Sequence, residues 1–266
     1  MINFLQVVLL GIIEGITEFL PISSTGHLLI AEQWLGHRSE AFNVVIQLGA
    51  ITAVLLIYWN RVVELARHSL KPENRDYLLK LGAAFGITVV GGLLASKLGL
   101  KLPKEVEPVA WAVYIGAMVL FAAEYYLRHH KPVDEVTWKI AVAMGLAQLL
   151  AAVFPGTSRS AATIIIGMLL GQSRSAATEF AFILGIPTMF AASAYELFKA
   201  RHELAHTGSG ELLDIAIGFV VSGVVAFFAV KWLISYIRTN TFLIFAWYRL
   251  VLGLGLLGAV YCGWLR

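Results

Sequence analysis

Charged residues are scarce in this chain. Only 14% of its 266 residues are Asp, Glu, Lys or Arg, whereas 59% are hydrophobic and the mean hydropathy is +0.77. Soluble domains carry about 25% charged residues, so this deficit, together with several long apolar runs, excludes a water-soluble protein and indicates a polytopic membrane protein. No stretch is polar enough and long enough to form a separate soluble domain.

Cysteine and N-terminal basic residues are also lacking. Cys262 is the single cysteine, so an intrachain disulfide is excluded. No Lys or Arg precedes the first apolar run and Glu14 follows soon after it, which argues against a cleaved signal peptide. The net charge of +3 comes from basic residues in short loops, as membrane topology requires, and does not indicate a nucleic-acid-binding surface.

Six segments are long and apolar enough to cross a bilayer, whose hydrocarbon core needs about 20 helical residues. The expected spans are residues 42–59, 81–99, 109–127, 176–198, 212–237 and 242–265. The loop of residues 60–80 is the most basic, which places it in the cytoplasm together with the loop of residues 128–139. Both termini are then expected on the outer side.

Two shorter apolar segments are each broken by a proline. Residues 2–36 break at Pro21 and residues 140–171 break at Pro155, because proline has no N–H to donate and disfavours helix in the residue before it. Each arm is too short to span the bilayer. We therefore predict two re-entrant helical hairpins with polar elbows near mid-membrane, where irregular backbone is tolerated only inside protein or beside a wet cavity.

The two hairpins resemble copies of one unit. A shift of 134 positions aligns Gly11 with Gly145, Glu14 with Gln148, Pro21 with Pro155, Ser23 with Thr157 and Ser24 with Ser158. An odd number of spans lies between the hairpins, so the copies are expected to be inverted and to enter from opposite faces. The predicted fold is a single all-α membrane domain, with repeat one at about 1–105, a linking span at 109–127 and repeat two at about 138–266.

The first elbow gathers ionisable and hydroxyl side chains at membrane depth. A charge there costs about 2.5–3.5 kcal/mol on insertion scales, so function is the default interpretation. Glu14 and Glu18 lie one helical turn apart and suit a hard divalent cation, which takes oxygen ligands and bridges to phosphate. The remaining polar groups lie at a half-helix N-terminus that attracts anions, with a histidine in reach as base or nucleophile. They are Ser23, Ser24, Thr25 and His27.

The second elbow supplies positive charge. Arg159 offers a planar guanidinium for bidentate contact with phosphoryl oxygens, and Ser158 and Ser160 add donors. Carboxylates and hydroxyls from one elbow and an arginine from the other suit phosphoryl transfer. The simpler alternatives are a structural ion pair between Glu14 and Arg159, hydroxyls that only cap helices, and a histidine that belongs to the core.

Polar residues in the other spans give weaker signals. Gln47 is either an interhelical hydrogen-bonding residue or a wall of the site. Arg249 either reaches the site or pairs with a carboxylate. Glu179 is expected to pair with Arg174 or to line the site, and Glu124, near the end of a span, is expected at the membrane interface.

The first elbow resembles the signature of a known family. Residues 14–27 read EGITEFLPISSTGH and are similar to the signature of the bacterial undecaprenyl-diphosphatases, also called bacitracin resistance proteins. Residues 155–160, PGTSRS, resemble the second signature of that family. Length, hydropathy and the hairpin layout agree over the whole chain. Ala161 departs from the pattern, which usually has glycine there.

The resemblance implies a membrane hydrolase that cleaves undecaprenyl diphosphate to undecaprenyl phosphate and inorganic phosphate, recycling the lipid carrier of peptidoglycan synthesis and conferring bacitracin resistance. It implies Mg²⁺ or Ca²⁺ on Glu14 and Glu18, and places Arg159 on the diphosphate. Ser24 is the expected nucleophile, with His27 as its base or a phosphate ligand; attack by His27 or by a metal-bound water is the alternative. Substrate contacts are expected from Ser23, Thr25, Gly26, Ser158, Ser160, Gln47 and Arg249.

The expected partners are a polyprenyl diphosphate and membrane lipid, without nucleic acid, and the sequence leaves a homodimer open. The expected location is the bacterial cytoplasmic (inner) membrane, with the site opening to the periplasmic side. The alternative function is an inverted-repeat transporter or lipid flippase, because broken helices in inverted repeats are typical of transporters. Transport, however, needs no nucleophile beside an acid pair and an arginine.

Overall fold

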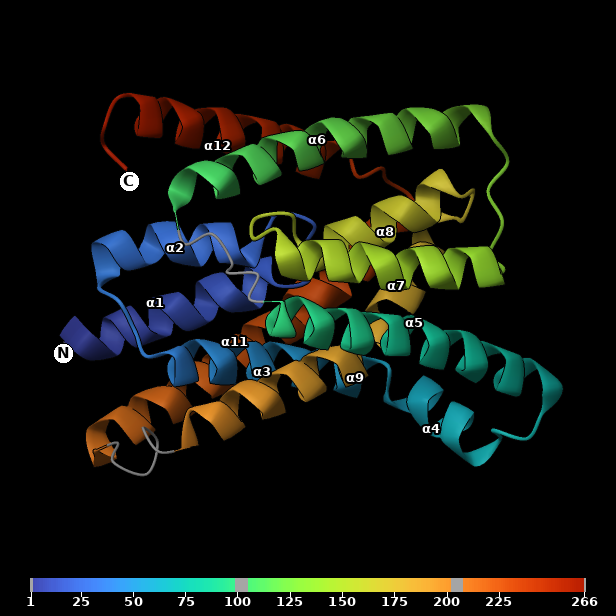
Figure 1. Ribbon diagram of the computed structural model, residues 1–266, viewed down its shortest axis with the longest axis horizontal. Coiled ribbons are helices and arrows are strands. Elements are labelled where there is room, and N and C mark those ends of the chain that lie inside the picture. The colour runs from blue at the N-terminus through green and yellow to red at the C-terminus, as the bar shows by residue number, and fades with distance from the viewer. Residues whose placement is uncertain (1, 99–104, 202–207, 266) are drawn as a thin grey trace.

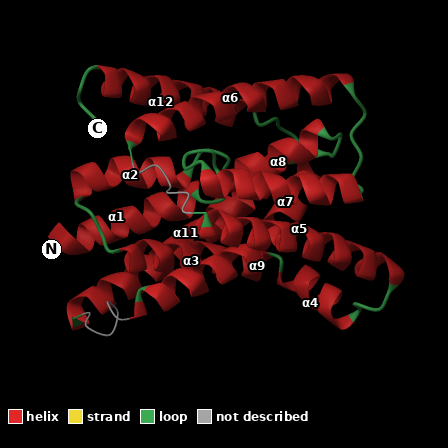
Figure 2. Cartoon of the chain, viewed as in Figure 1, coloured by secondary structure: helices red, strands yellow, loops and turns green. Residues whose placement is uncertain are grey.

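The computed structural model describes residues 2–98, 105–201 and 208–265, and in these ranges the chain is helical, without a β-strand (Figures 1 and 2). The helices run roughly along one direction and form a single bundle (Figure 1). They are α1 (Ile2–Thr17), α2 (Ser24–Leu35), α3 (Glu40–Ile57), α4 (Trp59–Arg67), α5 (Pro72–Lys97), α6 (Val106–His129), α7 (Trp138–Val153), α8 (Arg159–Leu169), α9 (Arg174–Lys199), α11 (Ser209–Ile237) and α12 (Leu243–Tyr261).

Six of these helices are long and apolar enough to cross a membrane, namely α3, α5, α6, α9, α11 and α12. This confirms the predicted all-α polytopic class with six spans. The basic segment of residues 60–80 is not simply a loop, because it contains α4 and the start of α5. Helix α5 begins at Pro72, since proline is pre-set for the first helical turn and Glu73 is favourable beside the positive end of the helix dipole.

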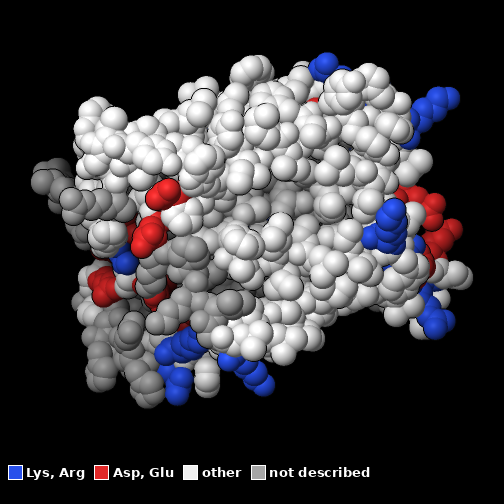
Figure 3. All heavy atoms as spheres, turned by 45° about the horizontal axis from the view of Figure 1, so that its top comes forward, with Lys and Arg blue, Asp and Glu red and all other residues white. Residues whose placement is uncertain are grey.

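The surface of the bundle has charged ends and an apolar middle. On the face shown in Figure 3, Lys, Arg, Asp and Glu side chains gather toward the two ends. Large apolar side chains are exposed along the helices, among them Val119, Val220 and Leu254. So much exposed apolar surface would be unfavourable in water and suits hydrocarbon. Both chain ends lie at the same end of the bundle (Figure 1).

The two helical hairpins point at each other. The α1–α2 hairpin extends inward from the end that holds the termini, and the α7–α8 hairpin extends from the opposite end, so their elbows meet in the middle (Figure 1). Ser160 joins the elbows, because its hydroxyl donates to the carbonyl oxygens of Glu18 at 3.4 Å and Leu20 at 3.3 Å. Opposite entry is the arrangement that an inverted repeat would produce. The repeat, and the re-entrant placement of the hairpins in a bilayer, stay predictions.

The elbows share one backbone conformation. Ser23 caps α2 with φ 78° and Ser158 caps α8 with φ 64°, and these are the non-glycine residues with positive φ in the described ranges. Each side chain accepts a hydrogen bond from the N–H three residues later, on Gly26 and Ala161 respectively. The caps lie 135 positions apart, one more than the prolines do. Ser158 is therefore the counterpart of Ser23, and the alignment of Ser158 with Ser24 is wrong by one residue.

One glycine of α1 and one of α3 allow close contact with α11. A β-carbon on Gly15 would lie 2.6 Å from the carbonyl oxygen of Ser222, which is closer than real contacts allow. A β-carbon on Gly49 in α3 would lie 2.3 Å from the carbonyl oxygen of Phe219. Backbone thus packs directly on backbone at both places, as small residues permit in membrane bundles. The Gly15 contact thus holds α1 against α11 at the residue that follows Glu14.

Candidate active site

The carboxylate of Glu18 is the centre of the candidate site. Glu18 is 7% exposed and follows the last turn of α1, where its N–H still donates to the carbonyl oxygen of Glu14 at 2.9 Å. Its Oε2 accepts the Ser24 hydroxyl at 2.5 Å. Its Oε1 lies 3.2 Å from Nη2 of Arg159 and 3.4 Å from Nε2 of Gln47. Residues of α2, α3 and α8 therefore converge on one carboxylate.

Ser24 is held as the first residue of α2. The positive φ of Ser23 turns the chain there, and the Ser23 hydroxyl is taken up by the cap, so Ser24 alone aims its hydroxyl at Glu18. A hydroxyl that donates to a carboxylate is arranged for activation by that carboxylate as general base. This contact differs from the expected one, in which His27 would be the base of Ser24.

His27 has two other partners. Its Nδ1 lies 2.6 Å from the carbonyl oxygen of Ser23, and its Nε2 lies 2.6 Å from the hydroxyl of Tyr248 in α12. The two rings are stacked, with centroids 5.6 Å apart and an interplanar angle of 7°. His27 is thus no isolated core histidine. Tyr248 was missed from the sequence, where its one signal is that it precedes an intramembrane arginine.

Arg159 sits at the junction of the hairpins. It pairs with Glu18, whereas the sequence alternative paired it with Glu14. Its guanidinium also lies 6.0 Å from the ring centroid of Phe19, and its side chain keeps 20% exposure. A guanidinium has five N–H donors, so one carboxylate partner leaves donors for phosphoryl oxygens.

Arg249 is fully buried and holds both elbows through backbone carbonyls. No carboxylate partner is found for it in the described ranges, so of the two alternatives for Arg249 the carboxylate pair is wrong. Its predicted contact with substrate stays a prediction. The carbonyl oxygens, 3.1–3.4 Å away, belong to Pro21 in the first elbow, Gly156 and Thr157 in the second, and Ala112 and Val113 in α6. This arginine therefore fixes the positions of the two elbows relative to each other.

A cleft of about 290 Å³ opens beside the acid pair. Its lining combines apolar and polar side chains, which suits a charged head group with a hydrocarbon tail. The lining residues are Glu14, Ser24, Thr25, Leu28, Leu29, Glu32, Asn43, Val44 and Gln47.

Two residues of α2 are buried, Gly26 and Glu32, and of these Glu32 lines the cleft. Glu32 was missed by sequence reasoning, although a carboxylate within an apolar helix was the available signal. It accepts from Nδ2 of Asn43 at 2.8 Å and lies 3.2 Å from Nδ1 of His37. Gly26 is buried, and a β-carbon there would lie 3.5 Å from Cγ1 of Val109. Its expected contact with substrate stays a prediction.

The hydroxyls of the second elbow face each other. The Oγ atoms of Ser158 and Ser160 are 3.1 Å apart, and Ser160 is buried between the elbows. Ser160 thus connects the two hairpins, whereas Ser158 caps α8 within its own hairpin. A direct contact with substrate stays a prediction for both.

The acid pair fits a divalent cation. Glu14 is 1% exposed, and its Oε2 is buried without a hydrogen-bond partner beside Glu18. No cluster of three or more His, Cys, Asp or Glu side chains occurs in the described part of the chain. Two carboxylates suffice for Mg²⁺, which commonly keeps several waters and takes phosphate oxygens from its substrate. The cation itself stays a prediction.

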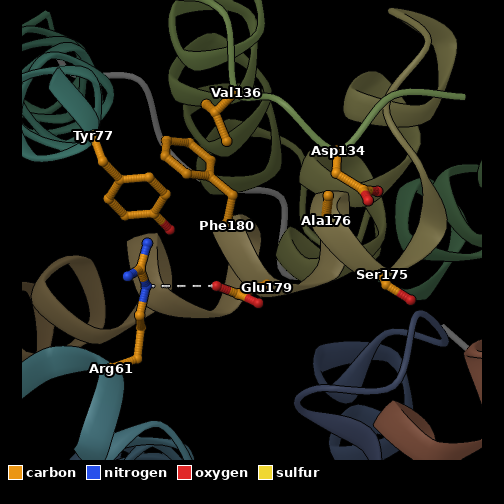
Figure 4. Close-up of a pocket in the computed structure, with 8 residues that line it drawn as sticks. All are labelled: Arg61, Tyr77, Asp134, Val136, Ser175, Ala176, Glu179 and Phe180. Carbon is orange, nitrogen blue, oxygen red and sulfur yellow. Dashed lines mark ion pairs between the residues drawn. The ribbon is translucent and has the colours of Figure 1, made fainter. Parts of the chain in front are cut away.

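Two carboxylates lie toward the other end of the bundle. Glu124 is completely buried and accepts hydrogen bonds from Arg174 and from the N–H of Phe242 at 2.7 Å. Its expected position at the membrane interface stays a prediction. Because Arg174 pairs with Glu124, Glu179 does not pair with Arg174. Its Oε1 lies 3.8 Å from Nε of Arg61, across a second hollow of about 350 Å³ between α4, α5 and α9 (Figure 4).

Comparison with known proteins shows the family of the chain. The family model described as bacitracin resistance protein BacA matches residues 7–255. The chain belongs to the bacitracin resistance protein family. Among its relatives, a protein of Rhizobium etli (strain CIAT 652) is 55% identical over 262 residues, 98% of each chain. One of Xanthomonas euvesicatoria pv. vesicatoria (strain 85-10) is 53% identical over 258 residues, 97% of each chain. Both are named undecaprenyl-diphosphatase, and both elbows lie inside the family match.

Proposed function

We propose that this chain is an undecaprenyl-diphosphatase, a multi-pass hydrolase of the bacterial inner membrane. It cleaves undecaprenyl diphosphate to undecaprenyl phosphate and inorganic phosphate. The carrier lipid is thereby recycled for cell-wall synthesis, and bacitracin resistance follows. The observation that carries the proposal is the 2.5 Å contact between the hydroxyl of Ser24 and the carboxylate of Glu18, with Arg159 on the same carboxylate.

Ser24 is the nucleophile in this proposal. Its Oγ forms a bond to the terminal phosphorus, the bond from that phosphorus to the bridging oxygen breaks, and undecaprenyl phosphate leaves. The Ser24 proton passes to Glu18, which lies on the path because it already accepts that hydrogen bond. Water then hydrolyses the phosphoserine, and Glu18 returns the proton to Ser24.

Arg159 and the cation on the acid pair offset the negative charge of the diphosphate in this proposal. The guanidinium of Arg159 binds phosphoryl oxygens in bidentate fashion, which stabilises charge on the transferred group. Glu14 and Glu18 hold a divalent cation such as Mg²⁺ or Ca²⁺, which neutralises diphosphate charge when bound. The buried, unpartnered oxygen of Glu14 supports this assignment.

The cleft suits a lipid substrate. Leu28, Leu29 and Val44 line it beside the carboxylates, so the head group reaches the acid pair while the prenyl chain stays in apolar surroundings. The α1–α2 hairpin enters from the end that holds both termini (Figure 1). The most basic segment, with α4, lies at the other end and is assigned to the cytoplasm. We therefore place the opening of the site on the periplasmic side.

Phosphate release tests the proposal. Purified chain in detergent is given undecaprenyl diphosphate, with and without Mg²⁺ or Ca²⁺, beside Ser24→Ala and Glu18→Gln. We expect cation-dependent release that falls at least about 100-fold in both variants. Ser96→Ala, an exposed serine of α5, is the control and keeps its activity. A folded wild type that binds the lipid and releases no phosphate would instead favour a transporter.

A further inference from the structure

The hydrogen bonds of His27 determine which of its nitrogens carries a proton. A backbone carbonyl oxygen only accepts, so the 2.6 Å contact with Ser23 requires hydrogen on Nδ1. In the neutral ring Nε2 is then an acceptor, and the hydroxyl of Tyr248 at 2.6 Å is its donor. Both ring nitrogens are engaged, so a proton enters or leaves His27 at Nε2 by way of the phenol oxygen.

The first chemical step has no need of this pair. In the proposed function the proton of Ser24 goes to Glu18, which already accepts its hydrogen bond. The second step still lacks a base, since hydrolysis of a phosphoserine requires that the attacking water lose a proton. His27 lies one turn beyond Ser24 on the same helix, and the phenol oxygen of Tyr248 lies 2.6 Å from its Nε2, so the pair stands one helical turn from the residue that would carry the phosphoryl group.

We propose that Tyr248 is a proton relay between His27 and the water that hydrolyses the phosphoserine. The oxygen of water forms a bond to phosphorus as the bond from phosphorus to Ser24 Oγ breaks. The water proton passes to the Tyr248 oxygen while the Tyr248 proton passes to Nε2 of His27. Glu18 returns its proton to Ser24, and His27 later releases its own to solvent. This inference rests on the proposed function and assigns a role that the second step requires.

The test separates the two steps. Full-length protein in detergent with Mg²⁺ is mixed with undecaprenyl diphosphate labelled on the terminal phosphate, and samples are quenched at short times. Undecaprenyl phosphate, free phosphate and protein-bound label are measured. In Tyr248→Phe, which keeps the stacked ring, we expect the first turnover of undecaprenyl phosphate to stay within about twofold of wild type. Free phosphate should appear at least about tenfold more slowly, with label held on the protein.

Matched variants complete the design. His27→Ala should show the same pattern, and the double variant should be no slower than the slower single variant, because the two residues act as one unit. Tyr261→Phe changes an exposed tyrosine of the same helix and should match wild type. In wild type, D₂O should slow release of free phosphate more than release of undecaprenyl phosphate, a readout that needs no variant.

Three results would overturn the relay. The first is wild-type turnover in Tyr248→Phe, the second is equal slowing of both products, and the third is an additive loss in the double variant. Failure of the proposed function looks different, because wild type would then form neither product.

Discussion

At the scale of single residues, Glu18 has two kinds of partner on its two oxygens. Oε2 accepts the hydroxyl of Ser24, while Oε1 faces the guanidinium of Arg159 and the amide of Gln47. The same guanidinium also serves the substrate in the proposed function, so its shape as well as its charge matters.

Replacing Arg159 by lysine tests that point. Lysine keeps the charge beside Glu18 but loses the planar pair of donors. We expect the KM for undecaprenyl diphosphate to rise about tenfold with a smaller loss of kcat, because a point charge replaces a bidentate contact. Arg61→Lys, in the hollow at the other end of the bundle, is the control. Unchanged KM in Arg159→Lys would remove this arginine from the diphosphate.

The variant Glu14→Gln tests cation binding by the acid pair without an activity assay. The Oε2 atom of Glu14 is buried and unpartnered, so Glu14→Gln removes a ligand and a buried charge at once. We expect the affinity for Mn²⁺, measured by electron paramagnetic resonance, to fall at least about tenfold, while the melting temperature does not fall. Glu196→Gln, on an exposed ion pair with Lys199, is the control. Equal Mn²⁺ binding in Glu14→Gln and wild type would contradict a cation on the acid pair.

At the scale of elements, the site depends on how two hairpins are held together. Arg249 of α12 donates to carbonyl oxygens of both elbows and of α6. Gly116 of α6 leaves the room for it, since a β-carbon there would lie 2.0 Å from Nη2 of Arg249. Three elements far apart in the chain thus meet on one buried side chain.

The substitution Gly116→Ala should disturb both elbows together. We expect a loss of about 1–3 kcal/mol in unfolding free energy, because the buried guanidinium must move from its carbonyls, and a drop in phosphate release. Gly82→Ala changes a helical glycine with open space around it and should be neutral or slightly stabilising. Thermal unfolding in detergent measures the change in stability, and steady-state kinetics measures the change in phosphate release. Equal stability of the two variants would show that Arg249 is not an anchor.

Local sequence patterns predicted the helices and the elbows. They could not predict contacts between residues far apart in the chain. The acid pair follows from helical spacing and the elbows from proline, so both were accessible from neighbouring residues. The partners of Arg249 and the contact between His27 and Tyr248 join residues more than 90 positions apart, and no periodicity reports such pairs. The partners of Glu124 were missed for the same reason, since Arg174 and Phe242 lie 50 and 118 positions further along the chain.

At the scale of the whole molecule, the charged ends and apolar middle give the bundle a direction in the membrane. The termini and the entry of the α1–α2 hairpin share one end, and α4 lies at the other (Figure 1). Excess basic residues mark the cytoplasmic side of a membrane protein. The catalytic cleft and the C-terminal end are then both expected to face the periplasm.

The single cysteine can report this orientation. Cys262 follows α12 and is exposed. In cells with a permeabilised outer membrane, a membrane-impermeant thiol reagent should label it before the inner membrane is broken, and Cys262→Ser should stay unlabelled. Labelling that appears only after lysis would place the termini in the cytoplasm and reverse the assignment.

Identifying the phosphorylated residue tests the account most directly. Wild-type protein and Tyr248→Phe are mixed with undecaprenyl diphosphate carrying a label on its terminal phosphate, quenched within the first turnover and digested for peptide mapping. The account predicts label on Ser24, and none in Ser24→Ala. Label on His27, or free phosphate without any labelled protein in either sample, would contradict attack by Ser24 with Glu18 as its base.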